Sequence, residues 1–187
     1  MEYKGNKKRC RWCNLKNEKY VIYHDQEWGV LCLDDHYLFE MLILESFQAG
    51  LSWECILNKR EAFCKAYDNF DIEKVVLYDE KKIEELRNNS LIVRNRLKII
   101  ASIENAKIFK NVQKEFGSFS NYLMNYTNGE IIVERDCTTN DLSDAISRDL
   151  MSRGMKFVGS TIIYSYLQAI GIIFSHDIDC FKSLEKI

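Results

Sequence analysis

Two of the three histidines in this chain of 187 residues lie close to cysteines at opposite ends of the sequence. Cys10 and His24 are near the start, and His176 and Cys180 are near the end. Two thiols and two imidazoles are the ligand set of a closed tetrahedral zinc site. Such a site would tie both ends of the chain into one folded unit. The alternative is four unrelated side chains, two of them ordinary buried thiols.

The spacing of these residues suits chelation but leaves one ligand open. His176 and Cys180 have an i, i+4 spacing, which places them on one helical face or across one turn. Cys10 belongs to the sequence C-R-W-C, so Cys13 is a second thiol that could chelate a metal or form a redox disulfide with Cys10. Position alone does not choose between Cys10 and Cys13.

Length and composition favour a single domain in a reducing compartment. A chain of 187 residues can bury a core without disulfide staples. The seven cysteines are an odd number, and Met1 leads into a basic segment without the apolar stretch of a signal peptide. We therefore expect a cytoplasmic protein with metal ligands or buried thiols. The uncharged run over residues 158–174 is slightly short for a bilayer span and predicts a buried helix.

The charge balance limits the kind of nucleic-acid binding that is possible. A net charge of −2 argues against a protein that coats nucleic acid through a broad basic face, but it allows contacts to a few phosphates. Basic residues gather in two places, and the simplest interpretation of each is a solvated surface. The two groups are Lys7, Lys8, Arg9 and Arg11, and Arg94, Arg96 and Lys98.

Helical periodicity dominates the sequence after residue 33, so the expected fold class is mainly α. There is no proline and no low-complexity segment, which favours one unit over several. Asp34 and Asp35 offer an N-cap for a helix through about Ala49, which Gly50 ends. A weak strand is predicted over residues 131–134. The further predicted helices span residues 59–67, 72–77, 80–88, 94–116, 119–126, 143–153 and 159–174.

The first predicted helix carries a carboxylate inside its apolar stripe. Leu38, Met41 and Leu42 share one face at about 100° per residue. Glu45 falls within that face, whereas Glu40 projects elsewhere. A carboxylate among apolar residues is costly unless it is paired, which makes Glu45 a candidate for a functional site. The simpler alternative is that Glu45 contacts a nearby arginine or a backbone amide.

Aromatic residues surround Glu45 in the sequence. Any single aromatic side chain belongs to a core more often than to a site. A cluster with an embedded carboxylate, however, is suited to a planar heterocycle, which it would hold by stacking and by hydrogen bonds to its edge. The aromatic residues concerned are Trp12, Tyr20, Tyr23, Trp28 and Trp53.

Six motifs follow one another along nearly the whole chain. The first three are R-C-R-W at 9–12, Y-x-x-Y-H-D-x-E-W-G-V at 20–30 and L-F-E-M-L-x-L-E-x-F-Q-A-G-L-S-W at 38–53. The others are R-N-R-L-K-I at 94–99, G-M-K-F-V-G-S-T-I-x-Y-S-Y-L-Q-A-x-G at 154–171 and the final H-x-x-x-C. In this order, the motifs resemble 3-methyladenine DNA glycosylase I.

The resemblance implies a helix-hairpin-helix DNA glycosylase fold, with a zinc site that joins the N- and C-termini. We expect one domain over 1–187, with a zinc-binding subregion over about 1–30 plus 160–187 and a hairpin-containing core over about 34–158. The implied activity is hydrolytic excision of 3-methyladenine flipped out of alkylated double-stranded DNA, which leaves an abasic site without lyase chemistry. We expect a monomer that contacts no membrane.

The resemblance also implies roles for individual residues. The implied zinc ligands are Cys10, His24, His176 and Cys180, with Cys10 preferred over Cys13 because it lies two residues before the motif tryptophan. Four protein ligands leave no open position, so the zinc is expected to be structural. Glu45 is the implied catalytic and base-recognising acid. Tyr20, Tyr23 and Trp53 are the implied pocket walls, with Trp12 and Trp28 beside them, and Arg94, Arg96 and Lys98 are expected to contact DNA.

Two positions depart from the family pattern, and one role is unassigned. Leu91 stands where the hairpin normally has a glycine, whose backbone would approach a phosphate closely. Arg94, Arg96 or Lys98 is therefore expected to carry more of the phosphate contact. Cys13 is an additional thiol that could compete for the metal. No motif identifies a second acid, for which Asp136, Asp141 and Asp144 are candidates.

Three other functions fit parts of the sequence. A noncatalytic zinc-stapled module could bind damaged DNA or a free modified base through the same aromatic cluster. A zinc hydrolase would use three protein ligands and a metal-bound water. A redox protein would use the Cys10 and Cys13 pair.

Overall fold

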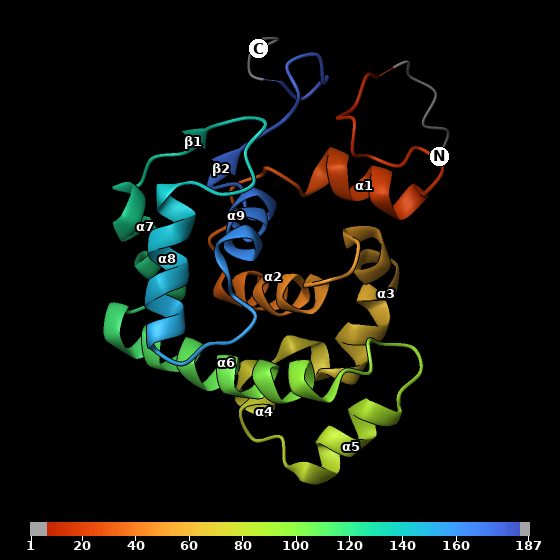
Figure 1. Ribbon diagram of the computed structural model, residues 1–187, viewed down its shortest axis with the longest axis vertical. Coiled ribbons are helices and arrows are strands. Elements are labelled where there is room, and N and C mark those ends of the chain that lie inside the picture. The colour runs from red at the N-terminus through yellow and green to blue at the C-terminus, as the bar shows by residue number, and fades with distance from the viewer. Residues whose placement is uncertain (1–6, 184–187) are drawn as a thin grey trace.

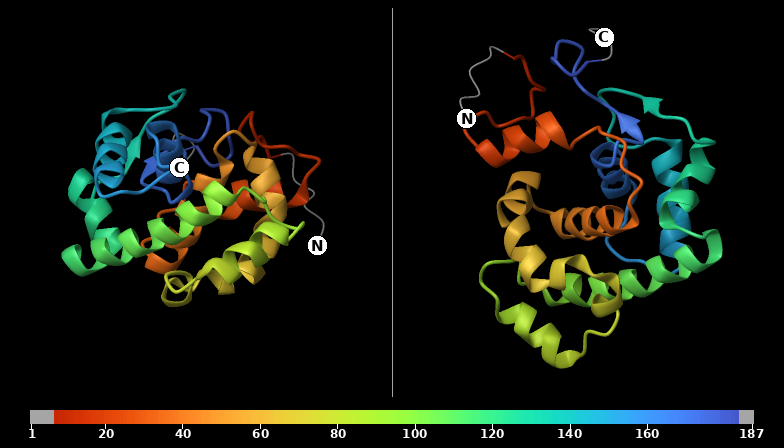
Figure 2. Two further views of the ribbon diagram at one scale, coloured as in Figure 1. Left: turned by 60° about the horizontal axis from the view of Figure 1, so that its bottom comes forward. Right: turned by 180° about the vertical axis from the view of Figure 1, so that it is seen from behind.

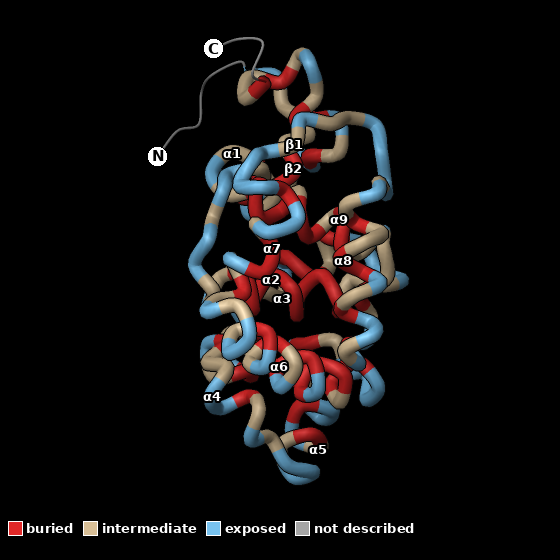
Figure 3. The backbone as a smooth tube through the Cα atoms, turned by 90° about the vertical axis from the view of Figure 1, so that its left-hand side faces the viewer, coloured by how far each residue is buried: buried red, intermediate tan, exposed pale blue. Residues whose placement is uncertain are grey.

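Helix α2 (Asp35–Gln48) lies at the centre of the computed structural model, which describes residues 7–183 (Figure 1). It contacts α3, α6, α7 and α9. All residues from Leu38 to Phe47 are buried, so α2 is enclosed around its whole circumference rather than along the one apolar stripe that the sequence predicts. Figure 3 shows this buried centre, with exposed residues concentrated in the outer loops and on α5.

The other helices pack around α2, so the mainly α fold class is confirmed. In Figure 1 a long helix runs beneath α2, and shorter helices lie around the two. These elements are α3 (Trp53–Ala66), the 3₁₀ turn η1 (Asp68–Phe70), α4 (Ile72–Val75), α5 (Glu80–Asn88), α6 (Arg96–Phe116), α7 (Phe119–Thr127), α8 (Asp141–Ser152) and α9 (Ser160–Ala169).

Polar residues cap the helices at the positions where these begin. The side chain of Asp34 accepts a hydrogen bond from the His36 amide at the start of α2. Asn140 and Ser143 form a reciprocal capping box at the start of α8. Ser52 caps α3 and starts it at Trp53, six residues earlier than predicted from periodicity, because a cap decides a helix start more sharply than an apolar pattern does.

One helix was not predicted. Residues 18–26 form α1 (Glu18–Gln26), where we expected irregular chain before residue 34. The segment is mostly polar, so its periodicity is weak. Asn17 nonetheless caps it by accepting hydrogen bonds from the amides of Lys19 and Tyr20.

The predicted last helix is shorter than expected. It ends at Ala169, and the chain turns at Gly171 into β2 (Ile173–Phe174), which pairs in parallel with β1 (Ile132–Val133). Gly171 has a φ of +79°, and a Cβ atom there would lie 2.3 Å from the backbone of Val30. Only glycine fits this turn, and it stops the helix.

The first and last described segments lie side by side at one end of the molecule (Figures 1 and 2). The amide of Phe181 donates to the carbonyl of Lys8 at 2.7 Å. His176 and Cys180 belong to the irregular segment after β2, so they lie across a turn and not on a final helix. Residues 1–6 and 184–187 of the predicted domain lie outside the described residues. Within residues 7–183, no helix is long and apolar enough to cross a membrane.

Candidate functional site

A cavity of about 270 Å³ lies beside the C-terminal turn of α2. All six residues predicted to bind a base line it, and they come from the N-terminal loop, α1, α2 and α3 and from the turn after α1. Helix α9 supplies a further wall. We call this cavity the aromatic pocket, and its lining residues are Trp12, Tyr20, Tyr23, Trp28, Glu45, Gln48, Trp53, Ser165 and Gln168.

The rings of the aromatic pocket pack against one another. The ring centroids of Trp12 and Trp28 are 4.7 Å apart with the edge of one ring against the other, and those of Tyr23 and Trp53 are 5.2 Å apart. Tyr20 lies against Trp12 with a centroid distance of 5.4 Å. Mutual packing fixes the orientation of large flat side chains, which gives the pocket rigid aromatic walls.

Glu45 lies in this pocket without a partner. Its side chain is only 2% exposed, and its Oε2 atom has no hydrogen-bond partner among residues 7–183. The simpler alternative of a neutralising arginine or amide is therefore wrong. Burial raises the pKa of Glu45 to about 8, because a carboxylate charge is poorly solvated there. A cationic or hydrogen-bond-donating ligand would satisfy this group.

Glu40, on the same helix, has the opposite surroundings. It is also buried, but Arg60 of α3 donates from Nε to its Oε1 at 2.7 Å. The same guanidinium donates from a terminal nitrogen to Glu27 at 2.6 Å. Glu27 is the C-cap of α1 and Glu40 is on α2, so Arg60 connects these two helices to α3. Tyr23 is on α1, Glu45 is on α2, and the start of α3 also lines the pocket. This contact holds the walls of the aromatic pocket in register.

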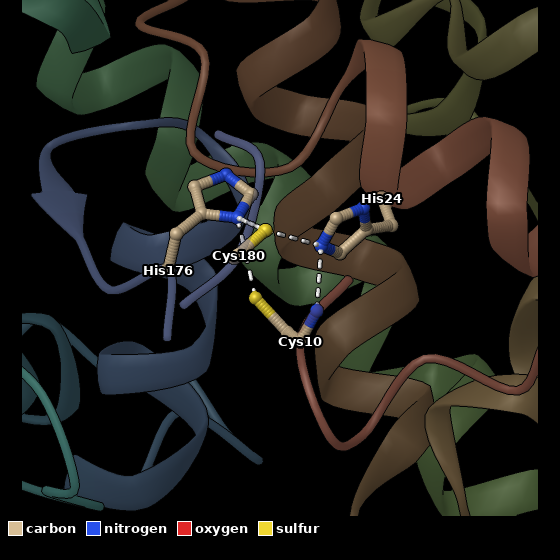
Figure 4. A group of neighbouring side chains, drawn as sticks. All are labelled: Cys10, His24, His176 and Cys180. Carbon is tan, nitrogen blue, oxygen red and sulfur yellow. Dashed lines mark hydrogen bonds between the residues drawn. The ribbon is translucent and has the colours of Figure 1, made fainter. Parts of the chain in front are cut away.

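The four predicted metal ligands converge on one point (Figure 4). Cys10, His24, His176 and Cys180 are buried, and one ligand atom from each lies within 4.8 Å of all the others. We call these four residues the Cys/His cluster. Its sulfur–nitrogen distances are 3.3 Å from Cys10 to His176, and 3.5 and 3.6 Å from Cys180 to His24 and His176. Ligands at the usual Zn–S and Zn–N lengths around a tetrahedral ion would be about 3.6 Å apart, so the donor set fits zinc.

The second ring nitrogen of each histidine is held by the protein. Nδ1 of His24 lies 2.8 Å from Oδ1 of Asp25, and Nε2 of His176 lies 3.3 Å from the carbonyl of Trp28. Partners of this kind select the tautomer and orient the other nitrogen. Nδ1 of His176 faces both sulfur atoms, and Nε2 of His24 faces Sγ of Cys180 and also accepts a hydrogen bond from the Cys10 amide at 3.3 Å. The four side chains are therefore arranged so that they could hold a metal ion.

Backbone amides complete the sulfur environment, and Cys13 takes no part in it. The amide of Asp177 donates to Sγ of Cys10 at 3.3 Å, and that of Lys182 donates to Sγ of Cys180 at 3.4 Å. Sγ of Cys13 instead lies 3.8 Å from the carbonyl of Tyr20, outside the cluster. The structure therefore assigns the N-terminal thiol of the cluster to Cys10.

The pocket and the cluster share a wall. The ring of Trp28 lines the aromatic pocket and also contacts His176, with ring centroids 4.7 Å apart. Trp12 likewise lies against His24 at 5.2 Å. A metal bound by the cluster would therefore position two pocket walls without touching the pocket contents.

The chain is similar to known proteins along most of its length. The family model for methyladenine glycosylases matches residues 12–183. The chain belongs to the methyladenine glycosylase family. Among its relatives, the DNA-3-methyladenine glycosylase 1 of Escherichia coli is 38% identical in an alignment of 178 positions that covers 92% of this chain and 95% of the relative. The DNA-3-methyladenine glycosylase of Haemophilus influenzae is 35% identical over 92% of this chain and 96% of its own length.

Solved structures of the methyladenine glycosylase family share this fold. A crystal structure of 3-methyladenine DNA glycosylase I has a TM-score of 0.90 and 37% identity, and the match covers 94% of this chain and all of that one. The Staphylococcus aureus enzyme, solved to study its recognition of 3-methyladenine, has a TM-score of 0.87 and 33% identity, with 98% of each chain covered. The mainly helical architecture is therefore that of the family.

In this methyladenine glycosylase family member, the three basic residues predicted to contact DNA have different surroundings. Lys98 is buried, and its ammonium donates to the carbonyls of Phe47 and Ala49 at 2.7 and 2.5 Å. Its charge is hydrogen bonded to carbonyls at the end of α2, so the predicted DNA contact does not fit Lys98. Arg94 and Arg96 are exposed, and Arg96 pairs with Glu80.

The candidates for a second acid lie away from the aromatic pocket. Asp136 is exposed and pairs with Arg11 at 2.8 Å, while Asp144 accepts a hydrogen bond from Ser160. Asp141 is an exposed residue at the start of α8. Among the residues that the structure describes, Glu45 is the only carboxylate lining the pocket, so none of the three aspartates takes the predicted role there.

Sequence reasoning missed three pocket residues, namely Gln48, Ser165 and Gln168. Gln48 is in the last turn of α2, three residues after Glu45, and the other two are on α9. The signal was available, because all three fall within motifs that carry the family resemblance. A glutamine or serine in a helix is nevertheless ordinary by composition, so nothing marked these residues as functional.

Proposed function

We propose that this chain is a DNA repair glycosylase, which flips 3-methyladenine out of alkylated double-stranded DNA and hydrolyses its N-glycosidic bond. The observation that carries the proposal is the buried, unpartnered carboxyl of Glu45 between aromatic walls. A planar cation with hydrogen-bond donors on its edge would satisfy both features. The proposal agrees with the family, whose relatives are named for this base.

Methylation at N3 supplies much of the reactivity in this mechanism. It gives adenine a positive charge, so the base leaves as a neutral molecule once the bond to C1′ breaks. Each aromatic wall favours the cationic ring by roughly 0.5–2 kcal/mol through cation–π attraction. The bound cation also favours the ionised form of Glu45, which lowers its pKa from about 8. Water then attacks C1′ of the oxocarbenium-like sugar and releases a proton.

Glu45 acts in this scheme by recognition and electrostatics. Its carboxylate accepts hydrogen bonds from the base edge and stabilises the positive charge that passes from the base to the sugar. Normal adenine is neutral, so it gains less from the same carboxylate. The lining residues of the aromatic pocket in the described part of the chain include no lysine, which fits a monofunctional hydrolase.

A structural zinc ion is the proposed occupant of the Cys/His cluster. The sulfur–nitrogen distances, the held histidine tautomers and the amides aimed at sulfur support it. Four protein ligands leave no position for a reacting water, so the ion would supply no chemistry. Its contribution would be to hold the chain ends and two pocket walls in place. A catalytic zinc hydrolase is therefore disfavoured.

We also propose that α5, residues 89–95 and α6 form the helix-hairpin-helix element that contacts DNA. The connection contains Leu91, which is 65% exposed, and Ile92, which is buried. The exposed Arg94 and Arg96 follow at the start of α6 and would contact phosphates. Loss of one phosphate contact in Arg94→Gln should weaken DNA binding and reduce the slope of its salt dependence by about 1.

The proposed organisation is a single glycosylase domain that acts as a monomer in the cytoplasm. The residues that line the aromatic pocket come from both the N-terminal and the C-terminal parts of the chain, as expected for a single domain. The Cys/His cluster connects the two ends of that chain.

Incubation with methylated double-stranded DNA tests the function. We expect the purified protein to release 3-methyladenine and to leave 7-methylguanine in the DNA. Chromatography of the released bases, with heat-treated DNA as the reference for total adducts, measures both. Absence of any released base would overturn the enzymatic proposal. If the protein then still bound methylated DNA, the noncatalytic binding module would be the better description.

A further inference from the structure

Three polar atoms of the aromatic pocket are buried without a hydrogen-bond partner among residues 7–183. They are Oε2 of Glu45, Oε1 of Gln48 and Nε1 of Trp53. Buried polar atoms are paired in the great majority of cases, because an unpaired one loses its solvation without compensation. Three in a single cavity therefore indicate that a ligand completes them.

Glu45 and Gln48 present their acceptors from the same face of α2. They are three residues apart, which places their side chains next to each other on a helix. The backbone around Gln48 is fixed, since the ammonium of Lys98 is hydrogen bonded to the carbonyls of both Phe47 and Ala49. The Gln48 side chain thus starts from a rigid position beside the Glu45 carboxyl.

The number and kind of these atoms match one type of purine edge. A 6-aminopurine carries two N–H donors on one nitrogen, with an unmethylated ring nitrogen as an adjoining acceptor. Two acceptors, from Glu45 and Gln48, and one donor, from Trp53, are its complement. A 6-oxopurine such as guanine places the acceptor O6 at that position instead, where it would face two further acceptors.

We propose that Gln48 is a second specificity-determining residue, whose carbonyl accepts one N–H of the 6-amino group while Glu45 accepts the other. This inference rests on the proposed function and extends it, because it predicts how the site separates 3-methyladenine from 3-methylguanine. Both bases carry the same N3-methyl cation, so charge and aromatic stacking do not distinguish them. They differ at C6, N1 and C2, and the 6-substituent is the group that would face Glu45 and Gln48.

The test uses the ratio of two bases released in one reaction. Gln48→Met keeps the length of the side chain but removes its hydrogen-bonding atoms. In methylated DNA, we expect the ratio of 3-methyladenine to 3-methylguanine excision rates to fall about fivefold, which corresponds to the loss of one net hydrogen bond. Damage to folding or to the general activity would lower both rates and would cancel in the ratio.

Two further variants separate the acceptor role from a packing role. Gln48→Glu keeps an acceptor, so its ratio should stay at or above that of the unchanged protein. Gln168→Met makes the same chemical change on α9 at a pocket residue with no buried unpartnered atom, and should leave the ratio unchanged. An unchanged ratio in Gln48→Met, or an equal fall in Gln168→Met, would overturn the inference.

The outcome for the unchanged protein distinguishes the two proposals. If it releases no base, the proposed function fails, and the role of Gln48 is decided by equilibrium titration of free 3-methyladenine and 3-methylguanine. The affinity ratio should then fall by a similar factor in Gln48→Met. If it releases 3-methyladenine but the Gln48 variants keep the same ratio, the function holds and only the specificity role is wrong.

Discussion

The aromatic pocket and the Cys/His cluster lie against the same tryptophan, yet their polar atoms differ in whether they have hydrogen-bond partners. In the cluster, the outer nitrogens of His24 and His176 have partners, and both sulfurs accept backbone N–H groups. In the pocket, Glu45, Gln48 and Trp53 each leave a buried polar atom unpartnered among the described residues. The cluster therefore suits the fixed ion that we propose for it, and the pocket suits a ligand that binds and leaves.

The same difference separates two carboxylates on one helix. Glu40 and Glu45 are both buried in α2, but Arg60 neutralises Glu40, and no described residue neutralises Glu45. Burial alone therefore does not identify a functional acid, since an ion pair can compensate a buried carboxylate for its lost hydration. A buried acid without such a partner is the better candidate, because its desolvation destabilises the folded protein until a ligand binds to it.

Removal of the metal should have the largest effect on stability. Cys180→Ser breaks the cluster, and we expect it to lose bound zinc and to lower Tm by about 10 °C or more, since ion binding contributes to the free energy of unfolding. Metal analysis and thermal unfolding measure this. Cys13→Ser is the matched control, a buried thiol outside the cluster, and should keep its zinc. Equal metal loss in both variants would contradict the assignment of Cys10.

Glu45→Gln tests the pocket side of the comparison. We expect the rate of 3-methyladenine excision to fall about 100-fold, because an amide cannot oppose the charge that develops on the sugar. Zinc content should not change. Glu61→Gln, at an exposed acid on α3, provides the control. A Glu45 variant that excised at the full rate would show that the unpartnered carboxyl has no catalytic role.

The raised pKa of Glu45 predicts an unusual dependence of stability on pH. The carboxyl has a pKa near the usual glutamate value of 4.5 when unfolded and of about 8 when folded, so between these values the folded state binds the extra proton. The free energy of unfolding should therefore fall as pH rises, by roughly 2 kcal/mol from pH 6 to pH 8. Glu45→Gln should lack this contribution. Denaturant unfolding of both proteins at each pH decides it, and parallel pH dependences would count against the assignment.

Arg60→Met should convert the compensated carboxylate into an uncompensated one. It leaves Glu27 and Glu40 facing each other without a cation, and we expect a loss of about 2 kcal/mol in the free energy of unfolding together with slower excision. Arg87→Met removes an exposed pair with Glu84 and should change stability by less than about 0.5 kcal/mol. Similar losses in the two variants would mean that Arg60 does not join the pocket helices as proposed.

The sequence predicted which residues form the two sites better than it predicted the contacts of those residues. The four cluster residues and the six pocket residues lie where the motifs implied. Glu45 was singled out by its apolar stripe, although α2 is buried on every side, so the stripe alone did not distinguish it from Glu40. The distinguishing fact is the contact with Arg60 of α3, twenty residues further on, which periodicity within one helix does not contain.

Other differences also arise from tertiary contacts. Lys98 looked like a surface cation beside Arg94 and Arg96, but its amine bonds to a carbonyl 51 residues away. Helix α1 was missed because its polar residues show little periodicity and its stability comes from a cap and from contacts with α3. The end of α9 depends on Gly171, which passes close to the backbone of Val30. Each of these partners is distant in sequence.

The position of the Cys/His cluster in the chain has a consequence for biosynthesis. Cys10 and His176 are separated by 166 residues, so at 5–20 residues per second the N-terminal ligands leave the ribosome roughly 10–30 s before the C-terminal ones. During that interval, Cys10 and His24 lack the two residues that complete the cluster. The walls provided by Trp12 and Trp28 are among the last parts of the pocket to be secured. Nascent chains should therefore bind no base until the final ligands are made.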